Sequence, residues 1–195
     1  VVTDLKIAAS FPTSHYLHAG APGGTVLAPE AADAIRAADV ILSLDWLDPA
    51  GTFKAVGNVG AKVIQVSVDH HLHNGWSMDY QGLPPVDVFI DCEPDVAVPP
   101  LLEALGPGPT RAAPGRAKAF PEPAGDKLTV DHLATALREA VGGRPATLTH
   151  VSLSWNGATW AFDHPLDYLG SDGGGGVGGG PGISVGAALA LKGSG

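Results

Sequence analysis

The sequence predicts an α/β fold, with a Rossmann-like parallel sheet in a first domain and the start of a second α/β domain after it. Three observations support this prediction. Short apolar runs stand at 39–44, 62–69 and 86–91, helical segments alternate with them, and a new helix and strand follow a stretch rich in Pro and Gly. Strands that alternate with helices are typical of parallel sheets.

The first domain is expected over residues 1–105. Its first helix begins at Pro29, because proline is favoured in a first turn and the alanines that follow propagate a helix well. The run at 39–44 is apolar throughout, as in strands buried on both faces. The run at 62–69 alternates β-branched residues. These runs predict neighbouring strands of one sheet.

A second helix is expected over about 95–105, after the third apolar run. Pro99 and Pro100 lie inside it, and a proline in a helix removes one backbone donor and clashes with the preceding turn. We therefore expect this helix to be irregular or short.

Residues 106–126 are rich in Pro, Gly and Ala without a usable period, which predicts a linker. The second domain is expected over 127–195. Thr129 is expected to cap a helix over 130–141 that Gly142 closes. A strand is expected over 146–153, and an apolar helix over 185–191.

Both ends of the sequence have the pattern of a piece of a longer chain. The sequence opens at Val1 without an initiator Met, in a run typical of a strand that has already begun. At the other end, the α/β pattern calls for another strand after the helix at 185–191. The first domain is thus expected to be incomplete at its N-terminus, and the second to be truncated.

Composition narrows the class of protein. The 195 residues are 45% hydrophobic and 16% charged, with a formal net charge of −9, which is typical of a globular chain whose acidic surface repels nucleic acid. The single cysteine, Cys92, excludes an internal disulfide framework and is compatible with a reducing compartment. No apolar stretch reaches the roughly 18–20 residues of a membrane helix. We therefore expect a cytoplasmic protein with no nucleic acid or membrane partner.

The glycine-rich segment over 170–182 is the chemically richest stretch. A flexible linker is one interpretation, although the segment runs into an apolar helix. A dinucleotide-binding turn is a second, since Gly174, Gly176 and Gly179 satisfy Gly-x-Gly-x-x-Gly. Such a turn follows directly on a hydrophobic strand, whereas 163–168 is largely polar. A Walker loop is excluded, because no Gly-Lys-Ser/Thr closes the run.

The third interpretation is a resemblance. The run Gly175-Gly176-Val177-Gly178, followed by Ser184-Val185-Gly186-Ala187-Ala188, resembles the Gly-Gly-Leu-Gly…Ala-Ala-Ile-Gly segment of thiamine-diphosphate enzymes. The group concerned contains acetolactate synthase and benzoylformate decarboxylase. Ser67-Val68-Asp69 stands where these enzymes have Asp-x-Asp in their central domain, and the linker and the helix after it also fall in similar places. The resemblance spans nearly the whole chain, but only the glycine-rich segment is specific.

The resemblance implies roles for six residues of the cofactor-binding domain. Val177 matches the apolar wedge under the bent cofactor, Gly175 matches the residue whose carbonyl receives the pyrimidine amino group, and Gly176 lies between them. Ser152, Ser154 and Asn156 match the loop that touches the diphosphate. The alternative for these three is that they are ordinary polar groups of a turn.

The resemblance also implies what this chain lacks. The catalytic glutamate belongs to an N-terminal domain, and the Mg²⁺ ligands belong to a Gly-Asp-Gly…Asn motif beyond Gly195, so no catalytic or metal-binding residue is assigned here. The chain alone is expected to be inactive. Asp45-Trp46 stands where flavin-binding members have Gly-x-Arg, which counts against FAD.

The function implied is that of a lyase, decarboxylase or carboligase acting on 2-oxo acids, in a homo-dimer or tetramer with thiamine diphosphate and Mg²⁺. A nucleotide-binding Rossmann-like module and a non-catalytic scaffold relative remain as alternatives. The cluster His70-His71…His73 raises a separate metal interpretation. In an extended segment His71 and His73 share a face that His70 opposes, so a loop at a strand end is the preferred interpretation.

Overall fold

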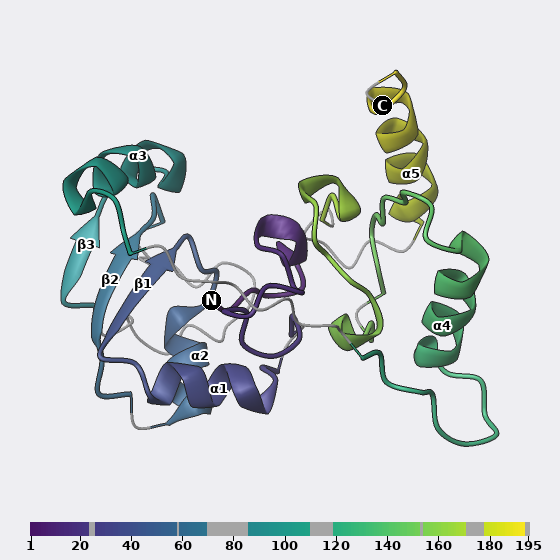
Figure 1. The fold of residues 1–195 in the computed structure, drawn as a ribbon, viewed down its shortest axis with the longest axis horizontal. Coiled ribbons are helices and arrows are strands. Elements are labelled where there is room, and N and C mark those ends of the chain that lie inside the picture. The colour runs from purple at the N-terminus through teal and green to yellow at the C-terminus, as the bar shows by residue number, and fades with distance from the viewer. Residues whose placement is uncertain are drawn as a thin grey trace. The chain divides into compact units, whose positions relative to one another are not determined.

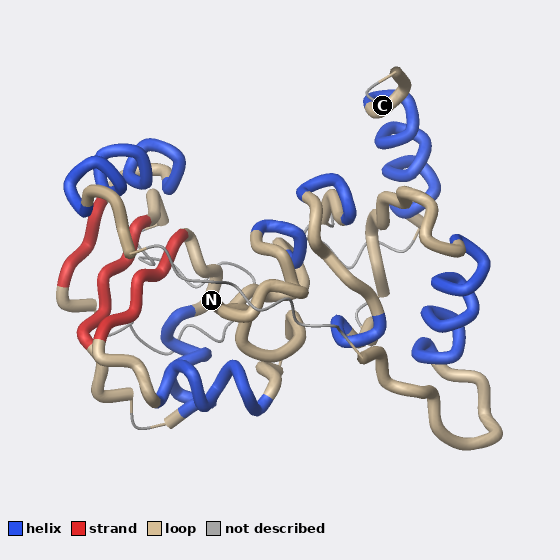
Figure 2. The backbone as a smooth tube through the Cα atoms, viewed as in Figure 1, coloured by secondary structure: helices blue, strands red, loops and turns tan. Residues whose placement is uncertain are grey.

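The computed structural model describes residues 1–23, 26–57, 59–69, 86–109, 119–152, 154–170 and 178–193. The chain divides into two compact units, which we call unit 1 (residues 1–31 and 113–195) and unit 2 (residues 32–112). Figure 2 shows the strands in unit 2, whereas the described part of unit 1 consists of helices and loops. The domain boundaries expected from the sequence remain a prediction.

Unit 2 is built on a parallel sheet of three strands, β1 (Val40–Leu44), β2 (Lys62–Val66) and β3 (Val88–Ile90), in the order β1-β2-β3. They lie side by side in Figure 1. Leu42 pairs with Ile64, which in turn pairs with Val88. The prediction of an α/β fold with a parallel sheet is confirmed at this level.

The helices near the sheet begin with proline. Helix α1 (Pro29–Arg36) lies where it was predicted, and α2 (Pro49–Val56) joins β1 to β2. Helix α3 (Pro94–Leu105) runs for 12 residues through Pro99 and Pro100. The expected range is confirmed, and of the two expected outcomes, an irregular helix or a short one, the short one is not found. The two prolines instead leave two backbone hydrogen bonds of the helix unmade.

Each face of the sheet has both buried and exposed side chains. Since paired residues of parallel strands point to the same face, Ser43, Val63 and Gln65 share one face, on which all three are buried. The opposite face is formed by Lys62 and by the apolar side chains of Val40, Leu42, Leu44, Ile64, Val66, Val88 and Ile90. On it, Val40 is 56% exposed and Val88 49% exposed. Parallel sheets are normally covered on both faces, and here the second face is only partly covered.

The core of unit 1 is small and rich in aromatic side chains. Helix α4 (Val130–Val141) packs against it through Ala134, which is fully buried. The Thr129 side chain accepts a hydrogen bond from the His132 N–H, and Gly142 ends the helix in a left-handed conformation. Both caps were predicted. The buried core residues are Leu5, Ala8, Ala9, Ala134, Trp155, Trp160, Phe162 and Tyr168.

Two predictions about strands in unit 1 were wrong. Over the described residues 146–152 there is no strand, and only Leu148 forms an isolated parallel bridge, to Tyr168. The residues from Val1 to Asp4, also expected to form a strand, make only an isolated bridge, between Asp4 and Gly23. β-branched alternation predicts a strand only where a partner strand continues beside it, and in unit 1 each pairing stops after one residue.

The described part of unit 1 also has three short turns of 3-10 helix: η1 (Ala8–Ser10), η2 (Gly157–Thr159) and η3 (Pro165–Asp167). The last helix, α5 (Gly179–Ala190), begins six residues before the predicted start at Val185. Pro181 stands in its first turn, where the missing N–H costs no intrahelical bond. None of the described helices has the length and apolarity needed to cross a membrane.

Candidate functional site

Three of the six residues singled out from the sequence can be located. Ser152, Ser154 and Asn156 lie in the loop between Leu148 and η2. Gly175, Gly176 and Val177 lie outside the described residues. The site is therefore built from the loop at 152–156 and from the helix that follows the glycine-rich segment.

The two serines lie next to each other at the surface. The hydroxyl oxygens of Ser152 and Ser154 are 3.3 Å apart, and both residues are exposed. The Trp155 N–H donates to the Ser152 carbonyl at 2.9 Å, which closes the turn that brings the hydroxyls together. Two adjacent hydroxyls at the surface can donate to one anionic group.

Asn156 has a structural role that occupies one end of its side chain. Its Oδ1 accepts from the Ala158 N–H at 3.0 Å and so caps η2. Its backbone carbonyl accepts from the Thr159 hydroxyl at 2.7 Å. Because the oxygen is engaged, the amide nitrogen of Asn156 is the part that can still donate to a ligand. The turn and ligand interpretations are thus compatible for this residue.

Packing below the loop fixes its position. Trp155 and Trp160 are 9% and 7% exposed, with ring centroids 6.4 Å apart. The Arg138 guanidinium donates to the Thr159 carbonyl at 2.7 Å, which ties η2 to α4. Gly157 lies so close to the Pro22 carbonyl that a Cβ atom at this position would collide with it. The polar side chains therefore stand on a well-packed support.

The N-terminus of α5 lies beside the segment that leads into this loop. The Thr149 and Ser184 hydroxyl oxygens are 2.9 Å apart, and a Cβ atom on Gly180 would lie 3.3 Å from the His150 ring. Gly178 precedes the helix with a φ of 97°, and among the described residues no side chain caps the first amides. Uncapped amides at a helix N-terminus carry partial positive charge and favour anions.

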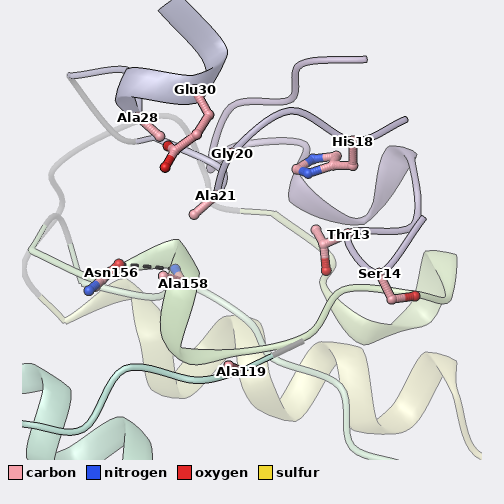
Figure 3. A pocket seen from close by; sticks show the side chains of 10 residues that line it. All are labelled: Thr13, Ser14, His18, Gly20, Ala21, Ala28, Glu30, Ala119, Asn156 and Ala158. Carbon is pink, nitrogen blue, oxygen red and sulfur yellow. Dashed lines mark hydrogen bonds between the residues drawn. The ribbon is translucent and has the colours of Figure 1, made fainter. Parts of the chain in front are cut away.

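A pocket of about 470 Å³ also lies in unit 1, and Asn156 is one of its walls (Figure 3). Its other polar walls include Thr13, Ser14, His18 and Glu30. Sequence analysis did not find these residues. They are distant from Asn156 along the chain, and no motif links them to it.

Tyr168 is a titratable residue of the aromatic core whose pKa is shifted. Burial raises the pKa of Tyr168, and the negative charge of Asp4 raises it further. The Tyr168 hydroxyl therefore stays protonated at neutral pH. In the described part of the chain, no group of three or more His, Cys, Asp or Glu side chains is arranged to hold a metal ion. His70, His71 and His73 lie outside that part.

Comparison with protein-family models, with curated proteins and with solved structures found no match to this chain. The arguments about its function therefore come from the residues themselves.

Proposed function

We propose that this chain is a segment of a thiamine-diphosphate-dependent lyase, decarboxylase or carboligase that acts on 2-oxo acids. On this proposal it comprises part of a central α/β domain and the start of a cofactor-binding domain. The parent protein is a cytoplasmic homo-dimer or tetramer. The chain by itself is inactive, because the catalytic glutamate and the Mg²⁺ ligands lie in motifs that this sequence does not contain.

The observation that carries the proposal is the junction before α5. The residues that resemble the cofactor-binding segment, Gly175-Gly176-Val177, come just before Gly178, and α5 begins directly after it with uncapped amides. A glycine-rich segment that leads into an open helix N-terminus is a suitable binding place for a diphosphate. This arrangement supports the proposal and argues against a featureless linker.

The donor groups of the neighbouring loop fit a diphosphate as well. The hydroxyls of Ser152 and Ser154 and the amide nitrogen of Asn156 would hold its oxygens. The segment that leads into their loop lies beside α5 at Thr149 and His150. When bound, thiamine diphosphate supplies the electron sink for decarboxylation, and the protein supplies binding and orientation. Val177 would support the bend of the cofactor, as the resemblance implies.

The nucleotide-binding alternative is disfavoured at the turn between β1 and α2. In Rossmann-like domains a dinucleotide places its diphosphate at such a helix N-terminus. Here the Asp48 carboxylate already accepts from the Gly51 N–H at 2.8 Å. A Cβ atom on Gly51 would collide with that carboxylate, so the two groups are in close contact. A diphosphate at this turn would meet a negative charge of the protein's own.

The test is made on the protein encoded by the complete reading frame. It is titrated with thiamine diphosphate in the presence of Mg²⁺, and separately with NAD and FAD, while tryptophan fluorescence is followed. Saturable binding of thiamine diphosphate, together with CO₂ release from pyruvate or benzoylformate, is the expected result. Preferential binding of NAD or FAD would support the nucleotide-binding module instead, and binding of none of the three would support the scaffold.

A further inference from the structure

The pocket of about 470 Å³ in unit 1 has the size of a small-molecule site, since such sites measure about 300–1,000 Å³. Its walls come from three parts of the chain: the loop at 13–21, the start of α1 with the residue before it, and residues 119, 156 and 158. All of them belong to unit 1. The pocket is therefore formed within a single compact unit.

Small side chains leave this space open. Ala21, Ala28, Ala119 and Ala158 line the pocket with methyl groups only. Gly20 has a φ of 74°, and a Cβ atom there would lie 2.9 Å from the Ala28 Cβ. The loop can therefore approach α1 only with glycine at this position. These alanine side chains give part of the lining an apolar surface suited to the hydrocarbon body of a ligand.

The charge at the pocket is negative. Glu30 is exposed, and its carboxylate has no hydrogen bond or ion pair to the residues that the structure describes. The Asp163 carboxylate, which is not part of the lining, accepts from the Ser14 N–H at 2.8 Å. Among the lining residues that the structure describes there is no lysine or arginine. The described walls of the pocket thus favour a cation over an anion.

The remaining polar groups divide into engaged and available ones. The Thr13 hydroxyl is engaged with Phe162 and Asp163, and the His18 ring lies 2.9 Å from the Thr3 hydroxyl. The Ser14 hydroxyl and the Asn156 amide nitrogen can still form hydrogen bonds with a ligand. Figure 3 shows Glu30 and Asn156 on one side of the view, and Thr13, Ser14 and His18 on the other.

We propose that this pocket binds a small organic amine, with its ammonium group at Glu30 and its apolar body against the alanine side chains. The proposal goes beyond the cofactor proposal and does not depend on it, because it rests on Glu30 and the alanine side chains. Asn156 is the residue that the two proposed sites share. The proposal rests on the volume of the pocket, on the alanine lining and on the Glu30 carboxylate, which has no partner among the residues that the structure describes.

Three probes of nearly equal size test the proposal: benzylamine, benzyl alcohol and benzoate, which are cationic, neutral and anionic. Each is titrated into the ¹⁵N-labelled 195-residue chain, and amide chemical shifts are followed by NMR. Benzylamine is expected to give saturable shifts at Ser14, Gly20 and Ala158. It should bind up to about fivefold more tightly than benzyl alcohol, as for an exposed ion pair, and benzoate should bind most weakly.

Glu30→Gln keeps the size of the side chain and removes its charge, so benzylamine should lose its advantage over benzyl alcohol. Glu139→Gln is the matched control, because Glu139 is an exposed residue of α4. In this variant benzylamine should still bind more tightly than benzyl alcohol. The proposal is overturned if benzylamine gives no saturable shift at the lining amides. It is equally overturned if the three probes bind alike, or if Glu30→Gln leaves the preference for benzylamine unchanged.

Discussion

Thr13 and Phe162 stand 149 residues apart in the sequence and are joined by two hydrogen bonds in unit 1. The Phe162 N–H donates to the Thr13 hydroxyl at 3.0 Å, and the Thr13 N–H donates to the Phe162 carbonyl at 2.9 Å. The Thr13 hydroxyl in turn donates to the Asp163 carboxylate at 3.4 Å. Both Thr13 and Phe162 are buried, so these bonds hold the N-terminal loop against the aromatic core.

Thr13→Val is expected to lower the free energy of unfolding by about 1–3 kcal/mol, because it leaves the buried Phe162 N–H without its acceptor. Thr135→Val is the matched control. The Thr135 hydroxyl is buried and has no partner among the described residues, so this variant should be neutral or more stable. Urea denaturation of both variants measures the difference. Equal losses in the two variants would contradict the role given to the Thr13 hydroxyl.

Gly157→Ala and Gly186→Ala should change stability in opposite directions. A methyl group at Gly157 would collide with the Pro22 backbone. The backbone must shift to make room for it, which should destabilise the protein by about 1–3 kcal/mol. Gly186 lies inside α5 with open space around it. There alanine should stabilise the helix by about 0.5–1 kcal/mol. Thermal unfolding followed by circular dichroism compares the two, and a harmless alanine at Gly157 would refute the close packing of that turn.

The ion pair between Asp87 and Lys62 is expected to make the free energy of unfolding depend on pH. The Asp87 carboxylate accepts from Lys62 Nζ at 2.7 Å and from the Val63 N–H at 2.8 Å. Two hydrogen bonds lower the pKa of Asp87: the larger effect comes from the bond with Lys62 and the smaller from the bond with the Val63 N–H. The bond between Lys62 and Asp87 also raises the pKa of Lys62. Asp87 therefore stabilises the fold above its unfolded pKa of about 3.9, and this contribution is lost as the pH falls through its folded pKa.

Asp87→Asn should consequently be less stable than the unaltered chain at pH 6, and the difference should shrink as the pH falls below about 4. Lys62 contributes in the opposite range, since its raised pKa gives stability below about pH 10.4 that is lost at higher pH. Asp126→Asn, in an exposed loop, serves as the control. Urea titrations at several pH values measure the effect. A difference that is independent of pH would show that the carboxylate charge is not involved.

The serine pair gives a prediction for the complete parent protein. Ser152→Ala combined with Ser154→Ala should weaken its affinity for thiamine diphosphate about tenfold, the equivalent of about 1.4 kcal/mol for lost bonds to a charged group. Ser10→Ala is the control, because Ser10 is exposed in η1, away from this loop in the sequence. Fluorescence titration measures both affinities. An unchanged affinity in the double variant would leave these serines as polar groups of a turn.

Local sequence signals were sufficient to predict those helices and strands whose ends are set by neighbouring residues. Thr129 and Gly142 were predicted as the caps of α4, and both act as caps. A threonine oxygen can accept from the first helical amides, and glycine adopts a left-handed conformation without strain. The apolar runs that became β1, β2 and β3 were found in the same way. Helix α2 was missed, although Asp48-Pro49 is a helix-start signal.

The candidate site could be predicted only in part. The sequence indicated that Ser152, Ser154 and Asn156 carry donors in one loop, and the structure has them in one loop. It did not indicate that the Asn156 oxygen is engaged with Ala158, or that the first turns of α5 lie beside Thr149 and His150. The roles of these residues in binding a cofactor remain predictions.

The sequence by itself determined the parallel α/β character of unit 2 and the position of α4, because periodicity and caps act over a few neighbouring residues. Only the tertiary structure decided that Leu148 forms a single bridge, that Thr13 bonds to Phe162, and that Glu30 and Asn156 line one pocket. Those pairings join residues far apart in the chain. They depend on the path of the backbone and on packing, which no local propensity encodes.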